Sequence, residues 1–210
     1  MLRSLVGSEM CIRDRTGTPD EFDLNGTISA TANNGGYLDV KMMPERKNRV
    51  KLLLFLDVGG SMDPYIQACE ELFSASKSEF KDLEHFYFHN CPYEILWKNN
   101  PRSSEDIIST WDIIRKYGSD YRVLFVGDAS MSPYEVAYAG GSIEHWNEEA
   151  GSVWLERITS HFDSVAWLNP ETKKIWNSSA SNKMIREIFE EKMYEMNLSG
   201  IEEAMKALSR

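Results

Sequence analysis

The chain has 210 residues, a formal net charge of -10, and 42% hydrophobic and 27% charged residues. This length suits one well-cored domain with a short additional segment, and the composition is typical of a folded globular protein. The acidic balance argues against binding to nucleic acid, which depends on Lys and Arg neutralising phosphates. The longest apolar runs, such as Leu52 to Leu56, are far shorter than the ~20 residues of a membrane-spanning helix, so we expect no membrane span.

Cysteine usage bears on the compartment in which the protein works. The three cysteines, Cys11, Cys69 and Cys91, are a sparse and odd-numbered set without CxxC spacing. Such a set is typical of buried thiols in a reducing environment rather than of a disulfide framework. We therefore expect a cytoplasmic protein.

The N-terminal part of the sequence differs from the rest. Residues 1–15 (MLRSLVGSEMCIRDR) lack the apolar core and cleavage site of a secretory signal. They resemble translated sequencing-adapter read-through, so we interpret them as an artefact and expect the chain to be a fragment without its true N-terminal part. Residues 16–48 are rich in Gly, Asn, Asp and Thr, with apolar residues too scattered to build a core. They are predicted to form a linker or docking strap, followed by a main domain at 49–210.

The first strong structural pattern is the apolar run from Lys51 to Asp57 (KLLLFLD), which ends in an acid. It is typical of a central parallel strand that is buried on both faces. Asp63 followed by Pro64 predicts the start of a helix, because an acid caps the first turn and proline fits its first position. Apolar residues at helical spacing extend this helix to Phe80.

Later segments repeat this alternation of strand and helix. A hairpin is predicted from His85 to His89 and from Glu94 to Trp97, buried strands from Arg122 to Gly127 and from Val165 to Leu168, and helices from Trp154 to Phe162, from Met184 to Met193 and from Ile201 to Leu208. Strands alternating with helices predict an α/β fold with a doubly wound, mostly parallel sheet flanked by helices. In such sheets, ligands bind at the carboxyl ends of the strands.

Two acids lie where predicted strands end. Asp57 and Asp128 each follow a buried apolar run, so their carboxylates converge on one edge of the sheet if the two strands are neighbours. Ser61 lies in the loop after Asp57, and hydroxyl and carboxylate oxygens with room for water suit Mg²⁺. Gly59 and Gly60 allow the backbone to turn sharply beside such an ion.

The segment Asp57-Val58-Gly59-Gly60-Ser61-Met62 resembles the first loop of the metal-ion-dependent adhesion site in von Willebrand factor A-type domains. That family's pattern is Asp-x-Ser-x-Ser, followed by a Thr from a second loop and an Asp from a third. Asp57 and Ser61 match the first loop, Asp128 matches the third, and Thr110 is the candidate from the second. Gly59 replaces the first serine, which implies a weaker site or one with an extra water.

The segments Asn48 to Asp63 and Tyr121 to Glu135 most resemble the bacterial CoxE-like branch of that family, and the resemblance extends over Asp20 to Arg210. Members of this branch work with MoxR-type AAA+ ATPases in maturing metalloenzymes. The resemblance therefore implies a Rossmann-like von Willebrand A fold with its adhesion site at the C-terminal strand edge. It also implies Mg²⁺, or Mn²⁺ or Ca²⁺, as the cofactor, and such an ATPase or a metalloenzyme client as the protein partner.

Several of these residues also have purely structural interpretations. Asp57 alone could be a helix-capping acid after a core strand. Thr110 lies either within a helix from Ser104 to Tyr117 or at the N-cap of a shorter helix, and we favour the shorter helix. We expect the serines that follow Asp128 to cap a helix that begins near Pro133.

The loop that contains His145 and Trp146 is of a kind that often carries function, and we predict that these two residues contact a partner. The function predicted from the sequence is thus an interaction module rather than an enzyme. One alternative is a Mg²⁺-dependent phosphoryl-transfer enzyme or hydrolase that uses Asp57. A second alternative is a scaffold with a degenerate metal site, as the glycine at position 59 would allow.

Overall fold

A computed structural model describes residues 19–35, 37–44, 48–143 and 145–209, so the predicted artefact at 1–15 lies outside the described residues. The main sheet contains seven strands: β3 (Asn48–Asp57), β4 (Phe80–Phe88), β5 (Ile95–Trp97), β6 (Ile107–Ser109), β7 (Arg122–Val126), β8 (Ser164–Asn169) and β9 (Met193–Glu195). Their order is β6-β5-β4-β3-β7-β8-β9. All pairings from β4 to β9 are parallel, whereas β5 is antiparallel to both of its neighbours. The predicted mostly parallel α/β sheet, with β3 at its centre, is confirmed.

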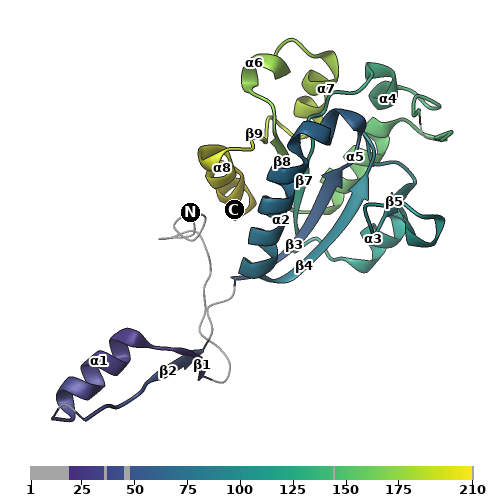
Figure 1. Cartoon of the computed structure of the whole chain (residues 1–210). Helices are drawn as coiled ribbons and strands as arrows, with labels where there is room; N and C mark the ends of the chain where they lie inside the picture. The colour runs from purple at the N-terminus through teal and green to yellow at the C-terminus, as the bar shows by residue number, and fades with distance from the viewer. Residues whose placement is uncertain (1–18, 36, 45–47, 144, 210) are drawn as a thin grey trace.

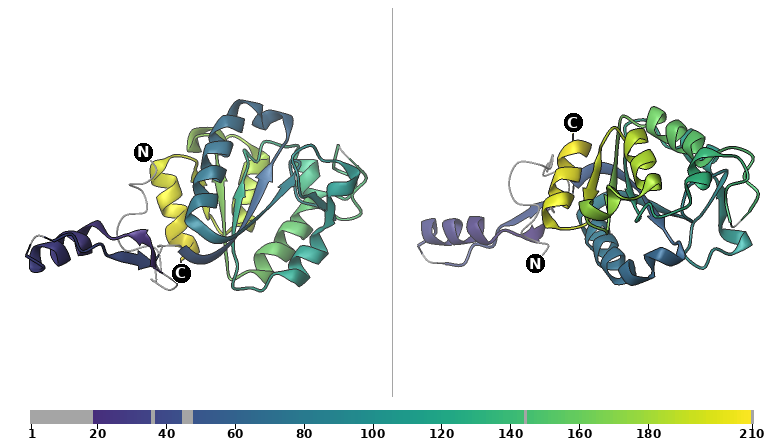
Figure 2. Two further views of the ribbon diagram at one scale, coloured as in Figure 1. Left: turned by 60° about the horizontal axis from the view of Figure 1, so that its bottom comes forward. Right: turned by 90° about the horizontal axis from the view of Figure 1, so that it is seen from above.

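Helices cover both faces of this sheet (Figures 1 and 2). They are α2 (Ile66–Glu79), α3 (Thr110–Lys116), α4 (Pro133–Ala137), α5 (Gly151–His161), α6 (Lys173–Trp176), α7 (Ala180–Ile188) and α8 (Leu198–Leu208). Buried residues of α2 and α8 pack on one face, and buried residues of α3, α5 and α7 pack on the other. The result is a three-layer sandwich with a separate apolar core on each side of the sheet.

The alternation of side chains along β3 explains the two cores. Leu52, Leu54 and Leu56 belong to one core, while Leu53 and Phe55 belong to the other. This is the period of two expected of a strand that is buried on both faces.

An aromatic stack joins the three central strands. The ring of Phe125 on β7 stacks on that of Phe55 on β3 at 4.7 Å and on that of Trp167 on β8 at 5.3 Å between centroids. The three residues are cross-strand neighbours in the sheet register. Each such pair contributes roughly 0.5–1.5 kcal/mol beyond its buried area, so β3, β7 and β8 form a rigid base for the loops that follow them.

The segment predicted as a linker or docking strap contains local secondary structure. Strands β1 (Pro19–Phe22) and β2 (Met42–Pro44) pair antiparallel, and helix α1 (Leu24–Asn33) lies between them in the chain. The carboxylate of Asp23 caps α1 by accepting a hydrogen bond from the Gly26 N–H at 2.8 Å. Figure 1 shows this unit apart from the main sheet, at the lower left of the view. Its role as a linker or strap stays a prediction.

Two helix boundaries differ from those expected. The residues around Asp63 and Pro64 form the 3-10 helix η2 (Gly60–Tyr65), so the α-helix begins later, at Ile66. Helix α7 ends at Ile188, and Met193 lies on β9. The reason is that Glu190 and Glu191 have positive φ angles of 51° and 62°, which turn the chain out of the helix.

One expected absence can be compared with the structure. Within 19–35, 37–44, 48–143 and 145–209, no helix combines the length and the apolar character needed to cross a membrane.

Candidate metal centre

Asp57 is the last residue of β3, and it is only 6% exposed. Its Oδ1 atom accepts hydrogen bonds from the backbone N–H groups of Gly59 and Asn90, both at 2.9 Å. Its Oδ2 atom is buried and accepts no hydrogen bond from any described residue. Because a buried polar atom without a partner is costly, this oxygen is the one of the two that is available for an interaction with a further group.

The Asp57 carboxylate lies against the first residue after β7. A Cβ atom added to Gly127 would lie 2.9 Å from the Asp57 Cβ and 3.1 Å from Oδ2. Any larger residue at position 127 would therefore push the carboxylate away from β7. Gly127 is thus the residue that allows Oδ2 to face the strand that leads into Asp128.

Asp128 follows at the end of β7 and is 2% exposed. Its Oδ1 atom accepts a hydrogen bond from the Ser130 N–H at 2.9 Å, and its backbone carbonyl accepts one from the Asn169 side chain at 2.8 Å. The next residue, Ala129, adopts a positive φ of 54°. The carbonyl of Ala129 accepts from the Ser181 hydroxyl at 2.7 Å and from the Asn182 amide at 3.2 Å.

The Asn169 amide also donates to Asn182 Oδ1 at 2.9 Å, which closes a buried network between β8, α7 and the loop after β7. A strand was predicted from the sequence up to Leu168, one residue before Asn169, but Ser181 and Asn182 were not predicted to position this loop. Buried polar side chains at the start of an otherwise amphipathic helix were the signal available, since α7 places both in its first turn.

The charge of Asp128 acts on the Asp57 carboxylate. Burial, the largest cause, together with the negative charge of Asp128 raises the pKa of Asp57 to about 7, although hydrogen bonds from Gly59 and Asn90 oppose this shift. Burial and the charge of Asp128 also raise the pKa of Glu171, which lies in the loop after β8. A cation at this edge would lower the cost of holding these carboxylates together.

Ser61 and Thr110 occupy different surroundings. Ser61 is exposed on η2, directly after the Asp57 loop. Thr110 is fully buried, and its hydroxyl donates a hydrogen bond to the Tyr93 carbonyl rather than to either aspartate. The shorter of the two helices considered for this region is confirmed, but its N-cap is Ser109 and Thr110 is its first residue. The structure therefore brings Asp57 and Asp128 together and leaves Thr110 bound to Tyr93.

The expectation that a serine caps the helix after Asp128 is also confirmed. Ser132 is the N-cap of α4, and it forms a capping box with Glu135, whose carboxylate accepts from the Ser132 N–H at 3.3 Å. Glu135 is only 2% exposed, so its carboxyl group is buried one helical turn beyond the Asp128 loop.

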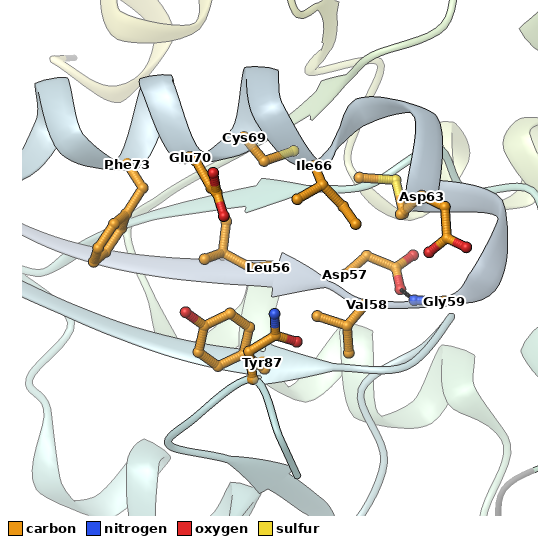
Figure 3. A pocket seen from close by; sticks show the side chains of 12 residues that line it. Leu56, Asp57, Val58, Gly59, Asp63, Ile66, Cys69, Glu70, Phe73 and Tyr87 are labelled. Atoms are coloured by element: carbon orange, nitrogen blue, oxygen red, sulfur yellow. Dashed lines mark hydrogen bonds between the residues drawn. The ribbon is translucent and has the colours of Figure 1, made fainter.

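A small pocket of about 170 Å³ lies beside Asp57, between β3 and α2. Figure 3 shows Asp57 and Gly59 at one end of it and Phe73 at the other. The acidic side chains of Asp63 and Glu70 and the Cys69 thiol also line it. Burial raises the pKa of Cys69 to about 11, so this thiol is protonated at neutral pH.

In the described ranges, no three His, Cys, Asp or Glu side chains are grouped so that they could hold a metal ion. The set predicted from the sequence has two carboxylates and two hydroxyl groups, so this observation does not test it.

The loop predicted to contact a partner has one half-buried and one exposed member. His145 packs edge-on against the Tyr93 ring at 5.5 Å and lies 3.6 Å from a Glu94 carboxylate oxygen, whereas Trp146 is 77% exposed. Asn147 is fully buried and anchors the loop through bonds to Ser142 and the Glu149 carbonyl. Of the two predicted residues, only Trp146 presents a large free surface.

Comparison with known proteins adds no assignment. The chain matches no model of a known protein family, and it matches no curated protein.

Proposed function

We propose that the chain is a divalent-cation-dependent protein-interaction module, namely a von Willebrand A-type domain of the CoxE-like branch. The observation that supports this most is the buried Asp57 carboxylate, which has an unpartnered oxygen beside Asp128 at the carboxyl edge of a mostly parallel sheet. Hard divalent cations prefer such oxygens. In this proposal the cation is held by Asp57, Ser61, Thr110 and Asp128, as the resemblance implies.

When bound, the cation would supply a Lewis-acidic position that accepts a carboxylate from a partner protein. The chain's own residues fix that position: Gly59 and Asn90 hold one oxygen of Asp57, and Ser130 holds one oxygen of Asp128. Trp146 offers an exposed aromatic surface for further partner contact. We propose a MoxR-type AAA+ ATPase or a metalloenzyme client as the partner, and maturation of metalloenzymes or remodelling of complexes as the process.

The test is calorimetric titration of Mg²⁺ and Mn²⁺ into the full chain and into Asp57→Ala and Asp128→Ala variants. We expect saturable binding in the parent and its loss in both variants. Asp63→Ala is the matched control, because Asp63 is an exposed acid that lines the same pocket. Equal weakening in this control would mean that general negative charge attracts the ion, and no binding in the parent would favour a scaffold with a degenerate site.

The alternative of a phosphoryl-transfer enzyme is separated by a second assay. Hydrolysis of a phosphate monoester that depends on Mg²⁺ and is lost in the Asp57→Asn variant would replace the interaction-module proposal. For the partner, binding of the purified ATPase should require the cation and should disappear when a chelator is added.

A further inference from the structure

We infer that Asn90 supplies the oxygen that the missing first serine would have provided, and that Glu135 positions the Asn90 side chain for this role. This inference rests on the proposed function. Gly59 stands where the family pattern has a serine, and the side-chain amide oxygen of Asn90 occupies the adjacent space.

Geometry at Gly59 is the first support. A Cβ atom added to Gly59 would lie 2.4 Å from Asn90 Oδ1 and 3.4 Å from Asp57 Oδ1. The first distance is far below van der Waals contact, so a serine at position 59 would force the Asn90 side chain out of its present position. The Asn90 oxygen thus fills the position of the absent serine side chain, next to the Asp57 carboxylate.

Hydrogen bonding by Glu135 fixes which end of the amide faces Gly59. Asn90 Nδ2 donates to Glu135 Oε1 and Oε2, both at 3.2 Å. A carboxyl oxygen accepts hydrogen bonds from an amide NH₂ group, so the NH₂ group of Asn90 faces Glu135 and its oxygen faces the Asp57 loop. Both side chains are buried, at 9% and 2% exposure, which keeps this arrangement away from competing water.

The backbone of Asn90 is specialised for the same place. Asn90 lies at the tip of a tight turn between His89 and Cys91, with a φ of 58°, a conformation that Asn tolerates better than most residues. In this conformation its N–H donates to Asp57 Oδ1. One residue therefore holds the carboxylate through its backbone and presents a neutral oxygen beside it through its side chain.

The chemistry of this exchange is conservative. A serine hydroxyl and an asparagine carbonyl are both neutral oxygen donors, so the formal charge of the site does not change. Asn carbonyl oxygens are common ligands of hard divalent cations, of Ca²⁺ in particular. The glycine at position 59 is then one half of a paired replacement, and the site need not be degenerate.

The test uses the variants Asn90→Gly, Gly59→Ser and the double variant, with Mg²⁺ and Ca²⁺ as the probes in calorimetry. Glycine at position 90 removes the side chain and keeps the positive φ without strain. We expect Asn90→Gly and Gly59→Ser each to weaken cation binding about tenfold to a hundredfold. The double variant should bind more tightly than either single variant, because the serine gains the space that Asn90 leaves.

Two further variants test the positioning role of Glu135. Glu135→Gln keeps an acceptor for the Asn90 amide and should bind the cation nearly as the parent does, whereas Glu135→Ala should resemble Asn90→Gly. Asn99→Ala is the matched control, since Asn99 is an exposed amide that also donates to a carboxylate, that of Asp106. Unfolding midpoints in a chelator establish that every variant is folded before its affinity is compared.

The outcomes separate this inference from the proposed function. If Asn90→Gly binds as the parent does while Asp57→Ala does not bind, the cation site stands and the role of Asn90 is wrong. If the double variant is no better than Asn90→Gly, the paired replacement is also overturned. If the parent binds neither cation, the proposed function fails.

Discussion

The loops after β3 and β7 begin with an aspartate each, yet they are stabilised in different ways. In the loop after β7, both the backbone and the Asp128 side chain have hydrogen-bond partners, and three buried side chains from β8 and α7 hold its strained turn. In the loop after β3, one oxygen of Asp57 has two backbone donors and the other has no partner among the described residues. Among the described residues, the loop after β7 thus has hydrogen-bond partners for the Asp128 side chain and backbone, whereas the loop after β3 keeps one Asp57 oxygen without a partner.

This difference predicts different roles for the two loops in a cation site. The loop after β7 holds the Asp128 carboxylate in a position that does not depend on a ligand. In the loop after β3, burial destabilises the charged form of the Asp57 carboxylate, and a bound cation would stabilise that form. Most of the free energy of cation binding should therefore depend on Asp57. We expect changes to the loop after β7 to act mainly on folding and changes at Asp57 to act mainly on cation dependence.

The largest effect should come from the network that holds the loop after β7. Asn182→Ala removes a donor from the Ala129 carbonyl and an acceptor from the Asn169 amide, both in a fully buried setting. We expect the unfolding free energy to fall by about 2–4 kcal/mol, measured by urea denaturation. Asn177→Ala, at an exposed amide nearby, is the control and should cost less than ~1 kcal/mol. Equal losses in the two variants would contradict a special role for the network.

A change at Asp57 should act in the opposite direction. Asp57→Asn removes a buried charge and retains an oxygen for the Gly59 and Asn90 donors. In chelator at pH 8, we expect its unfolding free energy to exceed that of the parent by roughly 1–3 kcal/mol. Added Mg²⁺ should stabilise the parent and leave the variant unchanged. A variant that is less stable than the parent in chelator would show that the carboxylate is not strained.

Both cation binding at Asp57 and the stability of the cation-free protein should depend on pH. The pKa of Asp57 is about 7 in the folded protein against an ordinary 3.8, so the folded state without a cation holds the extra proton between these values. Its stability should therefore fall as pH rises through this window and level off above about pH 7. Because the proton competes with the cation, Mg²⁺ should bind about tenfold more weakly at pH 6 than at pH 8, measured by calorimetry. A flat profile would count against Asp57 as a ligand.

The smallest effect on folding should come from changes in the loop of His145 and Trp146, which is predicted to contact a partner. Trp146 is 77% exposed, so Trp146→Ala should change the unfolding free energy by less than ~0.5 kcal/mol. His145→Ala should cost more, since His145 packs against Tyr93 and Glu94. If the proposed ATPase is the partner, its binding should weaken in the Trp146→Ala variant, and unchanged binding would remove Trp146 from the proposed interface.

The strands of the fold were predictable because each central strand is a continuous apolar run that ends in a polar residue. The short elements were not. Strand β6 has only three residues, and the apolar spacing around Ile107 and Ile108 fits a helix as well as it fits a strand. Strand β9 continues the helical spacing of α7, and only the positive φ angles of Glu190 and Glu191, at residues that rarely adopt them, separate the two.

The two aspartates of the candidate site were predictable because residues at the ends of neighbouring parallel strands must meet at one edge. Their supporting residues were not, since Asn90, Glu135 and Asn182 come from a hairpin turn and two helices far apart in sequence. Their roles depend on distances that only the folded chain sets. The glycine at position 59 was a recognisable departure from the family pattern, but the residue that fills its space lies 31 positions later.

The central claim is that the ends of β3 and β7 form a cation site that the folded chain leaves incomplete. The most direct test is urea denaturation of the full chain at pH 8, in chelator and in Mg²⁺ at about 100 times the measured Kd. We expect the unfolding free energy of the parent to rise by about 2.7 kcal/mol in Mg²⁺ and that of Asp57→Asn to stay unchanged. An unfolding free energy that is the same with and without Mg²⁺, Mn²⁺ and Ca²⁺ would contradict it.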